Sequence, residues 1–343
     1  MRPAPFRRTA LRILCLFLIL VLAAGVGIAA YFYHLLNQIH YVDPETAPTL
    51  SQEQLDAYLS AETEDGTHST APSMEPEEVE FETHDTQIDS SDIRNILLIG
   101  QDRREGESRA RSDTMILCTF NKAEKTLTLT SFLRDLYVEI PGYQNNRINA
   151  AYPAGGMTLL NKTLETNFGI HIDGNIEVDF QQFSKIVDLL GGVTIELRQD
   201  EADSINKGVP GALTAGPQLL NGSQALAYAR IRKLDSDGDF SRTSRQRKLL
   251  EALLATYKNA SLPTMLSLLS QLLPMVTTDM TETELLSLAL ELFPVLSDMK
   301  ITSQHIPAEG TYSYKTIRGM AVLVADLEAA RQLLKETLLK GTS

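Results

Sequence analysis

The feature that most constrains this chain is an uncharged apolar run of 21 residues, Ile13–Tyr33. As a helix rising 1.5 Å per residue, the run would span roughly 30 Å, the thickness of a bilayer's hydrocarbon core. Four arginines precede it, and Asp43 and Glu45 follow it. Because basic residues favour the cytoplasmic side, this asymmetry predicts a cytoplasmic tail (1–12), a single transmembrane helix (13–33) and an extracytoplasmic remainder at the cell membrane.

A cleaved signal peptide is the alternative interpretation of this run. The apolar core of such a peptide usually has about 7–15 residues and is followed by a small-residue cleavage site. Here the run is longer, and its small residues, between Gly25 and Ala30, lie inside it. The pattern therefore favours an uncleaved anchor.

The net charge of −13 is unevenly distributed along the chain. Fifteen of the 44 acidic residues lie between Asp43 and Asp92, and four of the 31 basic residues precede Ile13. The part of the chain after Asp92 therefore has 29 acidic and 27 basic residues, whose charges nearly cancel. The acidic stretch has few large apolar residues, so it buries too little surface to offset the entropy of ordering. We therefore expect a flexible acidic tether over 34–92, with a short helix near Ser51–Leu59, before a folded domain over 93–343.

Several function classes are disfavoured by what the sequence lacks. Cys15 and Cys118, in an apolar run and a predicted strand, do not suggest a disulfide, and the six histidines lack the spacing of a zinc site. No nucleophile elbow and no phosphate-cradling P-loop occurs. A cytoplasmic tail of twelve residues is too short for a DNA-binding domain, so no nucleic-acid partner is expected.

Strand and helix patterns alternate through the folded part and predict an α/β domain, with a sheet covered by helices on both faces. The predicted strands are Asn95–Gly100, Thr114–Phe120, Thr126–Phe132, Leu136–Ile140, Ile176–Asp179, Val193–Leu197 and Lys300–Ile306. The predicted helices are Gly156–Phe168, Phe180–Leu190, Gly222–Tyr228, Ser241–Tyr257, Leu262–Leu272, Glu282–Leu292 and Val324–Leu339.

An arginine-dense stretch follows the helix predicted to end at Tyr228. If 229–233 is extended, Arg230 and Arg232 point to one side. If the chain is helical from Ser241 onward, Arg242, Arg245 and Gln246 share a face, whereas Arg247 and Lys248 turn away and are expected to be solvated. Converging guanidiniums favour an anion such as phosphate, and a helix N-terminus favours the same ligand. A basic helix face that is solvated or paired with nearby aspartates is the alternative.

Two aspartates lie at the end of one predicted strand and the start of the next. Asp102 and Asp113 could therefore approach one hard cation, and Mg²⁺ prefers a few carboxylates together with water and phosphate oxygens. Aspartate is also common at strand ends as a turn residue. Arg134 follows another strand and could reach the same anion, whereas Asp135 is equally suited to orient an arginine, accept a proton or form a structural ion pair.

Seven motifs occur together in an order that resembles the LytR-CpsA-Psr family of bacterial cell-envelope proteins. They are NILLIGQDRR (95–104), RSDTM (111–115), RD (134–135), RINAAY (147–152), LLGGV (189–193), LNGSQALAYARIR (220–232) and DGDFSRTSRQ (237–246). The resemblance covers roughly Asn95–Leu339 and implies an αβα sandwich with a central mixed sheet and an apolar tunnel for a prenyl chain.

The resemblance also implies an activity: transfer of a glycopolymer, of teichoic acid or capsule type, from a polyprenyl-pyrophosphate carrier to peptidoglycan in a Gram-positive type envelope. The family's metal-binding aspartates align with Asp102 and Asp113, for Mg²⁺ or Mn²⁺. Residues matching its pyrophosphate-binding set are Arg104, Arg111, Arg134, Arg230, Arg232, Arg242, Arg245 and Gln246. Arg134, Asp135, Arg230, Arg232 and Asp239 are the candidate catalytic residues, with Asp135 and Asp239 as candidate general bases.

Two other functions remain open at this stage. One is a non-catalytic envelope regulator that binds prenyl pyrophosphate, and the other is a hydrolase in which water replaces the acceptor. The apolar helices within Leu262–Leu292 could wall the tunnel, although ordinary core packing explains such stripes more often.

Overall fold

A mixed seven-stranded sheet forms the centre of the domain, in the order β1-β10-β7-β2-β3-β4-β11. The computed structural model describes residues 39–61, 71–81, 91–102 and 110–339. Strands β7 and β2, β4 and β11, and β1 and β10 run parallel, and the other neighbours run antiparallel. The strands are β1 (His40–Tyr41), β2 (Ile93–Gln101), β3 (Ser112–Asn121), β4 (Thr126–Phe132), β7 (Gly174–Asp179), β10 (Thr277–Thr278) and β11 (Lys300–Ile306).

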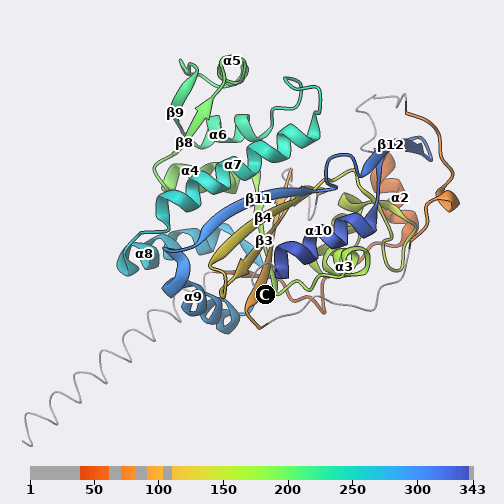
Figure 1. Cartoon of the computed structure of the whole chain (residues 1–343), viewed down its shortest axis with the longest axis horizontal. Helices are drawn as coiled ribbons and strands as arrows, with labels where there is room; N and C mark the ends of the chain where they lie inside the picture. Colours follow the sequence, from red (N-terminus) through yellow and green to blue (C-terminus); the bar gives the residue numbers. More distant parts are fainter. Residues whose placement is uncertain (1–38, 62–70, 82–90, 103–109, 340–343) are drawn as a thin grey trace, which may run out of the picture.

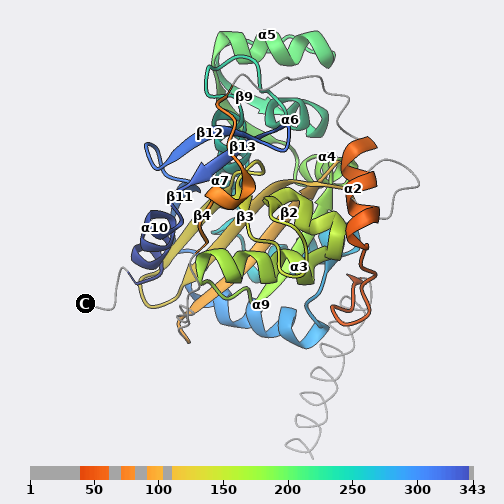
Figure 2. The same cartoon turned by 90° about the vertical axis from the view of Figure 1, so that its right-hand side faces the viewer.

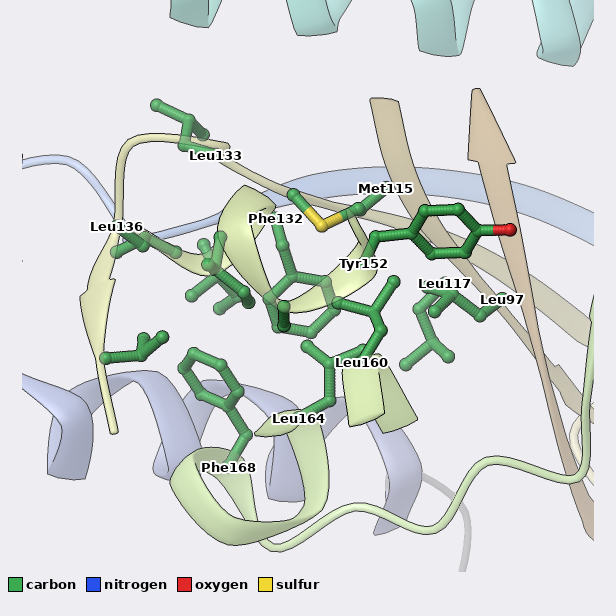
Figure 3. Close-up of a cluster of buried hydrophobic side chains, with 14 of the residues drawn as sticks. Leu97, Met115, Leu117, Phe132, Leu133, Leu136, Tyr152, Leu160, Leu164 and Phe168 are labelled. Atoms are coloured by element: carbon green, nitrogen blue, oxygen red, sulfur yellow. The ribbon is translucent and has the colours of Figure 1, made fainter. Parts of the chain in front are cut away.

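One face of the sheet is covered by α3 (Ala151–Phe168) and α10 (Leu327–Leu339). Figure 1 shows both helices on one side of β3, β4 and β11, and Figure 2 shows α3 lying across the sheet. Leu97 and Leu117 of the sheet pack here with Leu160 and Phe168 of α3, as Figure 3 shows. Because side chains alternate along a strand, the intervening residues of β2 face the opposite layer.

That opposite layer consists of α7 (Asp239–Tyr257), α9 (Glu282–Leu296) and α4 (Phe180–Leu189), with α8 (Leu262–Leu272) beyond them. Ile96 of β2 and Leu129 of β4 pack here against Leu254 of α7 and Leu292 of α9. The predicted α/β fold with a central mixed sheet between helices is confirmed. Strands buried on both faces need such cover, because neither face is polar enough to meet water.

A second, smaller core lies above the end of α4. It is built by β8 (Val193–Leu197) and β9 (Gly216–Leu220), which pair antiparallel, with α5 (Gln199–Gly208) and α6 (Gly222–Ala229). Gly191 and Gly192 end α4 with φ of 81° and 93°, and a Cβ on Gly192 would lie 2.8 Å from the Leu220 carbonyl oxygen. Glycine is therefore required at this turn.

Several element boundaries differ from the sequence prediction. The predicted helix 324–339 begins only at Leu327, because Val324 belongs to β13 (Met320–Ala325), which pairs with β12 (Tyr312–Ile317). The strand predicted over 136–140 is reduced to β5 (Tyr137–Val138), paired with β6 (Asn146–Arg147). Helix α5 and strands β9, β12 and β13 were not predicted.

The prediction of a flexible tether over 34–92 is wrong for the segments 39–61 and 71–81. Helix α2 (Gln52–Ala61) inserts Leu55, which is 0% exposed, into the same core as α3. The Tyr143 hydroxyl donates to the Leu50 carbonyl at 2.6 Å, and Met74 N donates to the Thr316 carbonyl at 3.0 Å. A few well-spaced apolar residues hold these segments on the domain, which the average composition conceals.

Within the described ranges, no helix combines the length and the apolar character needed to cross a membrane. The predicted span 13–33 and the predicted tail 1–12 lie outside those ranges.

Replacing Leu55 with alanine should destabilise the whole domain. The side chain leaves a cavity in the main core, so we expect the free energy of unfolding to fall by about 2–5 kcal/mol. Urea denaturation of the purified protein measures this loss. Glu53→Ala, an exposed change in the same helix, should stay within about 0.5 kcal/mol of the parent. Equal effects of the two variants would mean that α2 is not part of the folded unit.

Candidate active site

The site lies at one end of the sheet, where three neighbouring strands bring their polar ends together. Gln101 of β2 pairs with Ser112 of β3, so Asp102 and Asp113 lie at the same end of this strand pair. Strand β4 runs antiparallel to β3 and ends near the same level, which positions Arg134 just beyond it. The first turn of α7 and the chain after α6 complete the site from above the sheet.

Arg134 links β3, β4 and α7 through its guanidinium. Its Nη1 donates to Asp113 Oδ1 at 2.8 Å, and its Nε donates to Asp239 Oδ2 at 2.9 Å. Burial alone would lower the pKa of Arg134, but Asp113, Asp239 and Asp135 outweigh burial and raise it above its ordinary value. Arg134 is therefore a permanent cation at the centre of the cluster.

Arg242, in the first turn of α7, contacts the same two aspartates. Its Nη2 donates to Asp239 Oδ2 at 3.1 Å and to the backbone carbonyl of Asp113 at 3.2 Å. Burial and the neighbouring Arg134 lower the pKa of Arg242 to about 10, despite the opposing effect of Asp239. Arg242 Nε is buried without a hydrogen-bond partner among the described residues. The charge of Arg242 is thus incompletely neutralised by the protein.

The two arginines after α6 reach the aspartates at the strand ends. Arg230 Nη2 lies 3.6 Å from Asp102 Oδ2, and Arg232 Nη2 lies 3.6 Å from Asp113 Oδ2. They do so although 229–233 is not the predicted extended strand: Arg230 ends α6 with φ −98° and ψ −2°. Both arginines thus reach the strand-end aspartates, and the extended conformation considered for 229–233 does not occur at Arg230.

The cluster has more positive than negative charge. Four aspartates meet five arginines, which leaves one excess positive charge; the residues are Asp102, Asp113, Asp135 and Asp239, with Arg134, Arg147, Arg230, Arg232 and Arg242. Burial by itself would raise the pKa of Asp113, but the Arg134 and Arg242 guanidiniums outweigh it and hold that pKa below its ordinary value. Asp113 is therefore ionised, and the excess charge suits an anionic ligand.

An apolar cavity of about 230 Å³ opens beside this cluster, between the sheet and helices α4, α6 and α7. Arg230 and Gln246 are the only charged or amide side chains in its lining, and Gln246 Oε1 is buried without a partner among the described residues. The Arg230 guanidinium lies 4.9 Å from the centre of the Phe180 ring. The apolar walls include Ile116, Ile176, Phe180, Phe183, Leu249 and Leu253.

Among the described side chains of Leu262–Leu292, none lines this cavity. Leu288 and Leu292 of α9 instead pack on the sheet in an ordinary core. Phe180 and Phe183 were not predicted as cavity residues, because the apolar face of α4 has the pattern of an ordinary amphipathic helix. They line the cavity only because of the distance between the packed helices, which no local sequence pattern encodes.

Arg245 does not join the cluster, and its predicted place there is wrong. It is buried, with Nε donating to Glu201 Oε1 at 2.8 Å and Nη2 paired with Asp235. Glu201 belongs to α5, which the sequence analysis did not predict. Arg242, Arg245 and Gln246 share a helix face as predicted, but each meets a different neighbour.

The other predicted arginines have varied positions. Arg111 donates from Nη2 to the Leu59 carbonyl of α2 at 3.2 Å. Arg104 lies outside the described residues. Arg247 was expected to be solvated, but it is only 5% exposed, so that prediction is wrong; Lys248 is exposed as expected.

Asp135 faces two guanidiniums at the edge of the cluster. Arg147 Nη1 donates to Asp135 Oδ1 at 3.1 Å, and Arg134 Nε lies 3.7 Å from Asp135 Oδ2. No role was predicted for Arg147, although it is the first residue of the RINAAY motif.

Asp102 and Asp113 are the residues that could hold a divalent metal ion. Both supply only oxygen donors, from adjacent strand ends, and the neighbouring arginines favour a phosphate that would add further oxygens. This donor set fits Mg²⁺, which keeps several waters and binds one or two carboxylates together with phosphate. Among the described residues, no group of three or more His, Cys, Asp or Glu side chains forms a metal cage.

The fold and the site together define an α/β protein that joins an arginine–aspartate cluster to the mouth of an apolar cavity, an arrangement suited to an amphiphilic anion. The model of the LytR_cpsA_psr family matches residues 57–338 of the 343. The chain belongs to the LytR-CpsA-Psr family.

Two curated relatives match about half of the chain. The polyisoprenyl-teichoic acid–peptidoglycan teichoic acid transferase TagT of Bacillus subtilis (strain 168) is 39% identical over 177 residues, which are 50% of this chain and 54% of TagT. The regulatory protein MsrR of Staphylococcus aureus (strain COL) is 37% identical over 161 residues, 46% of this chain and 47% of MsrR. The chain thus spans about half the length of the curated relatives it matches.

Solved structures of TagT share the fold over most of the domain. TagT bound to LIIa-WTA has a TM-score of 0.61 at 29% identity and covers 76% of this chain and 96% of TagT. The family protein YwtF (TagT) with bound octaprenyl pyrophosphate lipid has a TM-score of 0.57 at 27% identity, with the same coverage.

Arg245 should prove to be a structural residue. Arg245→Met leaves the buried Glu201 without its partner, so the free energy of unfolding should fall by about 3–5 kcal/mol. The double variant Arg245→Met, Glu201→Met should regain most of this loss, because Asp235 keeps a second partner in Arg198, 2.9 Å away. Denaturation curves of the three proteins measure the effect. A stable single variant that no longer binds prenyl pyrophosphate would instead make Arg245 a ligand.

Proposed function

We propose that this protein is a membrane-anchored phosphotransferase that moves a glycopolymer, of teichoic acid or capsule type, from a polyprenyl-pyrophosphate carrier to peptidoglycan outside the cell membrane. The observation that carries the proposal is the direct junction between the arginine–aspartate cluster and the apolar cavity. Arg230 belongs to both, because it pairs with Asp102 and lines the cavity. A ligand with a pyrophosphate head and a hydrocarbon tail matches both halves.

The relatives support the same ligand and reaction class. One is named a teichoic acid transferase that uses a polyisoprenyl-linked substrate, and one related structure contains octaprenyl pyrophosphate. The predicted apolar run 13–33 would anchor the protein as a single-pass membrane protein with its N-terminus in the cytoplasm. The substrate lipid would then reach the cavity from the same membrane.

The proposed reaction is a displacement at phosphorus. The acceptor hydroxyl of a peptidoglycan sugar attacks the phosphorus nearer the glycopolymer, forming a new P–O bond. The bond to the bridging oxygen breaks, and polyprenyl phosphate leaves with the electron pair. Arg134, Arg232 and Arg242 would neutralise the phosphate oxygens, because phosphoryl transfer needs positioning and charge stabilisation more than a protein nucleophile.

Asp239 and Asp135 are the two candidates for accepting the hydroxyl proton. Both arginine contacts of Asp239 fall on Oδ2, so its Oδ1 is the better placed oxygen for a proton. Asp135 meets a guanidinium with each of its oxygens. The geometry therefore favours Asp239 as the general base and Asp135 as the residue that orients Arg134 and Arg147.

A divalent ion, Mg²⁺ or Mn²⁺, would be held by Asp102 and Asp113. When bound, it would supply further neutralisation of the pyrophosphate charge. Arg230 and Arg232, each 3.6 Å from one of these aspartates, would help to neutralise the phosphate oxygens.

The decisive experiment combines the purified protein with a lipid-linked oligosaccharide and soluble peptidoglycan fragments. Covalent attachment of the oligosaccharide to the fragments, with release of polyprenyl phosphate, is the expected result. Binding without transfer would favour a non-catalytic envelope regulator, the class suggested by the name of MsrR. Release of the oligosaccharide without an acceptor would favour a hydrolase.

Arg232→Lys should reduce the transfer rate without loss of the fold. Lysine keeps the charge but loses the planar pair of donors that matches phosphate. Loss of one charge-assisted hydrogen bond removes about 1.5–3 kcal/mol, so kcat/KM should fall by about ten- to a hundredfold. Arg198→Lys, a partly exposed arginine outside the cluster, serves as the control in the same assay. Parental turnover in Arg232→Lys would remove Arg232 from the site.

Asp113→Asn should weaken the response to metal. The amide keeps the shape but loses the charge that a hard cation prefers. Either activity is abolished, or half-maximal activity needs at least about tenfold more Mg²⁺, equivalent to about 1.4 kcal/mol. Mg²⁺ titration of activity, with the exposed Asp200→Asn as control, measures the effect. An unchanged metal response would exclude Asp113 as a metal ligand.

A further inference from the structure

A row of aromatic side chains leads from the cluster to solvent. Phe240, next to Asp239, stacks on Tyr312 of β12 with ring centres 4.9 Å apart. Tyr312 meets Tyr314 edge-to-face at 5.7 Å, and Tyr314 is 54% exposed. Tyr312 and Tyr314 lie on one face of the strand, because side chains alternate. We call these three residues the aromatic row.

The hairpin β12–β13 that carries the row is fixed beside the site. Leu323 N, opposite Tyr314 in the hairpin, donates to the Asp135 carbonyl at 2.8 Å. Burial raises the pKa of Tyr314, and Tyr312, Asp239, Asp237 and Asp135 add to this rise. The contact of the hairpin with Asp135 therefore places the exposed Tyr314 ring at the rim of the cluster.

The order of the strands separates the aromatic row from the apolar cavity. The cavity lies over β7, β2 and β3, whereas the row approaches the side of β4 and β11, where Phe240 meets His305 of β11 at 5.1 Å. Arg134, Asp113 and Asp239 lie between them. A ligand can therefore approach the cluster from the row without crossing the cavity.

This separation matters for the direction of the reaction. In a displacement at phosphorus, the attacking and leaving oxygens lie roughly in line on opposite sides. With the prenyl chain in the cavity, the leaving phosphate is on the β2–β3 side, and the acceptor must arrive from the side of the aromatic row. The candidate base Asp239 is the residue next to Phe240, at the start of the row.

The acceptor has the chemistry that an exposed aromatic ring recognises. One face of a pyranose ring carries C–H bonds with slight positive charge, and the face of an aromatic ring is negative. Tyrosine also supplies a hydroxyl for hydrogen bonds to the sugar. We propose that Tyr314, supported by Tyr312 and Phe240, stacks on a sugar of the peptidoglycan glycan strand and positions its acceptor hydroxyl; this proposal rests on the proposed function.

Direct binding tests the subsite without requiring catalysis. The probe is a soluble, uncross-linked peptidoglycan oligosaccharide, titrated calorimetrically into the full-length protein in detergent. Tyr314→Ala should raise its Kd about tenfold, whereas Tyr314→Phe, which keeps the ring, should stay within about threefold of the parent. Tyr41→Ala, at a tyrosine that is 49% exposed on β1, is the matched control and should change nothing. Unchanged binding by Tyr314→Ala, or no binding by the parent protein, overturns the subsite.

The transfer assay separates the subsite from the proposed function. Tyr314→Ala should raise KM for the acceptor and leave the Kd of the lipid carrier unchanged. If Tyr314→Ala instead raises only the Kd of the lipid carrier, the aromatic row binds the donor glycan, and the proposal is overturned. Transfer with an unchanged acceptor KM would retain the proposed function and sink the subsite. Oligosaccharide binding that depends on Tyr314, in a protein without transfer, would retain the subsite and sink the function. Unfolding midpoints confirm that each variant is folded.

Discussion

The contact between Arg134 and the two aspartates Asp113 and Asp239 is the interaction on which the rest of the site depends. It joins three elements, β3, the chain after β4 and the start of α7, at 2.8 and 2.9 Å. Apolar side chains such as Leu250 and Leu254 hold the rest of α7 against the sheet. The Arg134 contact leaves Arg242 only partly neutralised. The same charged groups therefore hold these three elements together and form the candidate anion site.

The motifs predicted the residues that meet at the site more accurately than the backbone conformations and contacts that bring them together. Arg230 and Arg232 reach Asp102 and Asp113, although Arg230 belongs to the end of α6 and not to a strand. The end of a helix therefore brings both side chains to the strand ends. Helical periodicity placed Arg242 and Arg245 on one face but could not say what each would meet. Arg245 meets Glu201 of α5, a helix that was not predicted.

The limits of the fold prediction have a similar physical origin. Composition averages over a window, so the many acidic residues around α2 concealed Leu55, which is fully buried in the core with Leu50 and Leu59 packed beside it. Arg247 was expected in solvent from its helical angle, but the approach of β11 covers it. The cavity is built from three strands and three helices, and its existence depends on how far apart these elements pack. These distances between elements arise from tertiary packing, so the spacing of residues along the sequence does not reveal them.

Two buried polar atoms at the boundary between the charged cluster and the apolar cavity lower the local stability of α7. Arg242 keeps a buried Nε without a partner, and Gln246 keeps a buried Oε1 without one, each among the described residues. An unpaired buried polar group costs about 1–3 kcal/mol. Two such groups on consecutive turns of α7 therefore lower the free energy of unfolding of a fold whose net stability is small. They flank the boundary between the charged cluster and the apolar cavity. A pyrophosphate would accept a hydrogen bond from Arg242, whereas a hydrocarbon tail in the cavity offers no hydrogen bond to Gln246. Only the charged half of such a ligand would therefore offset part of this cost.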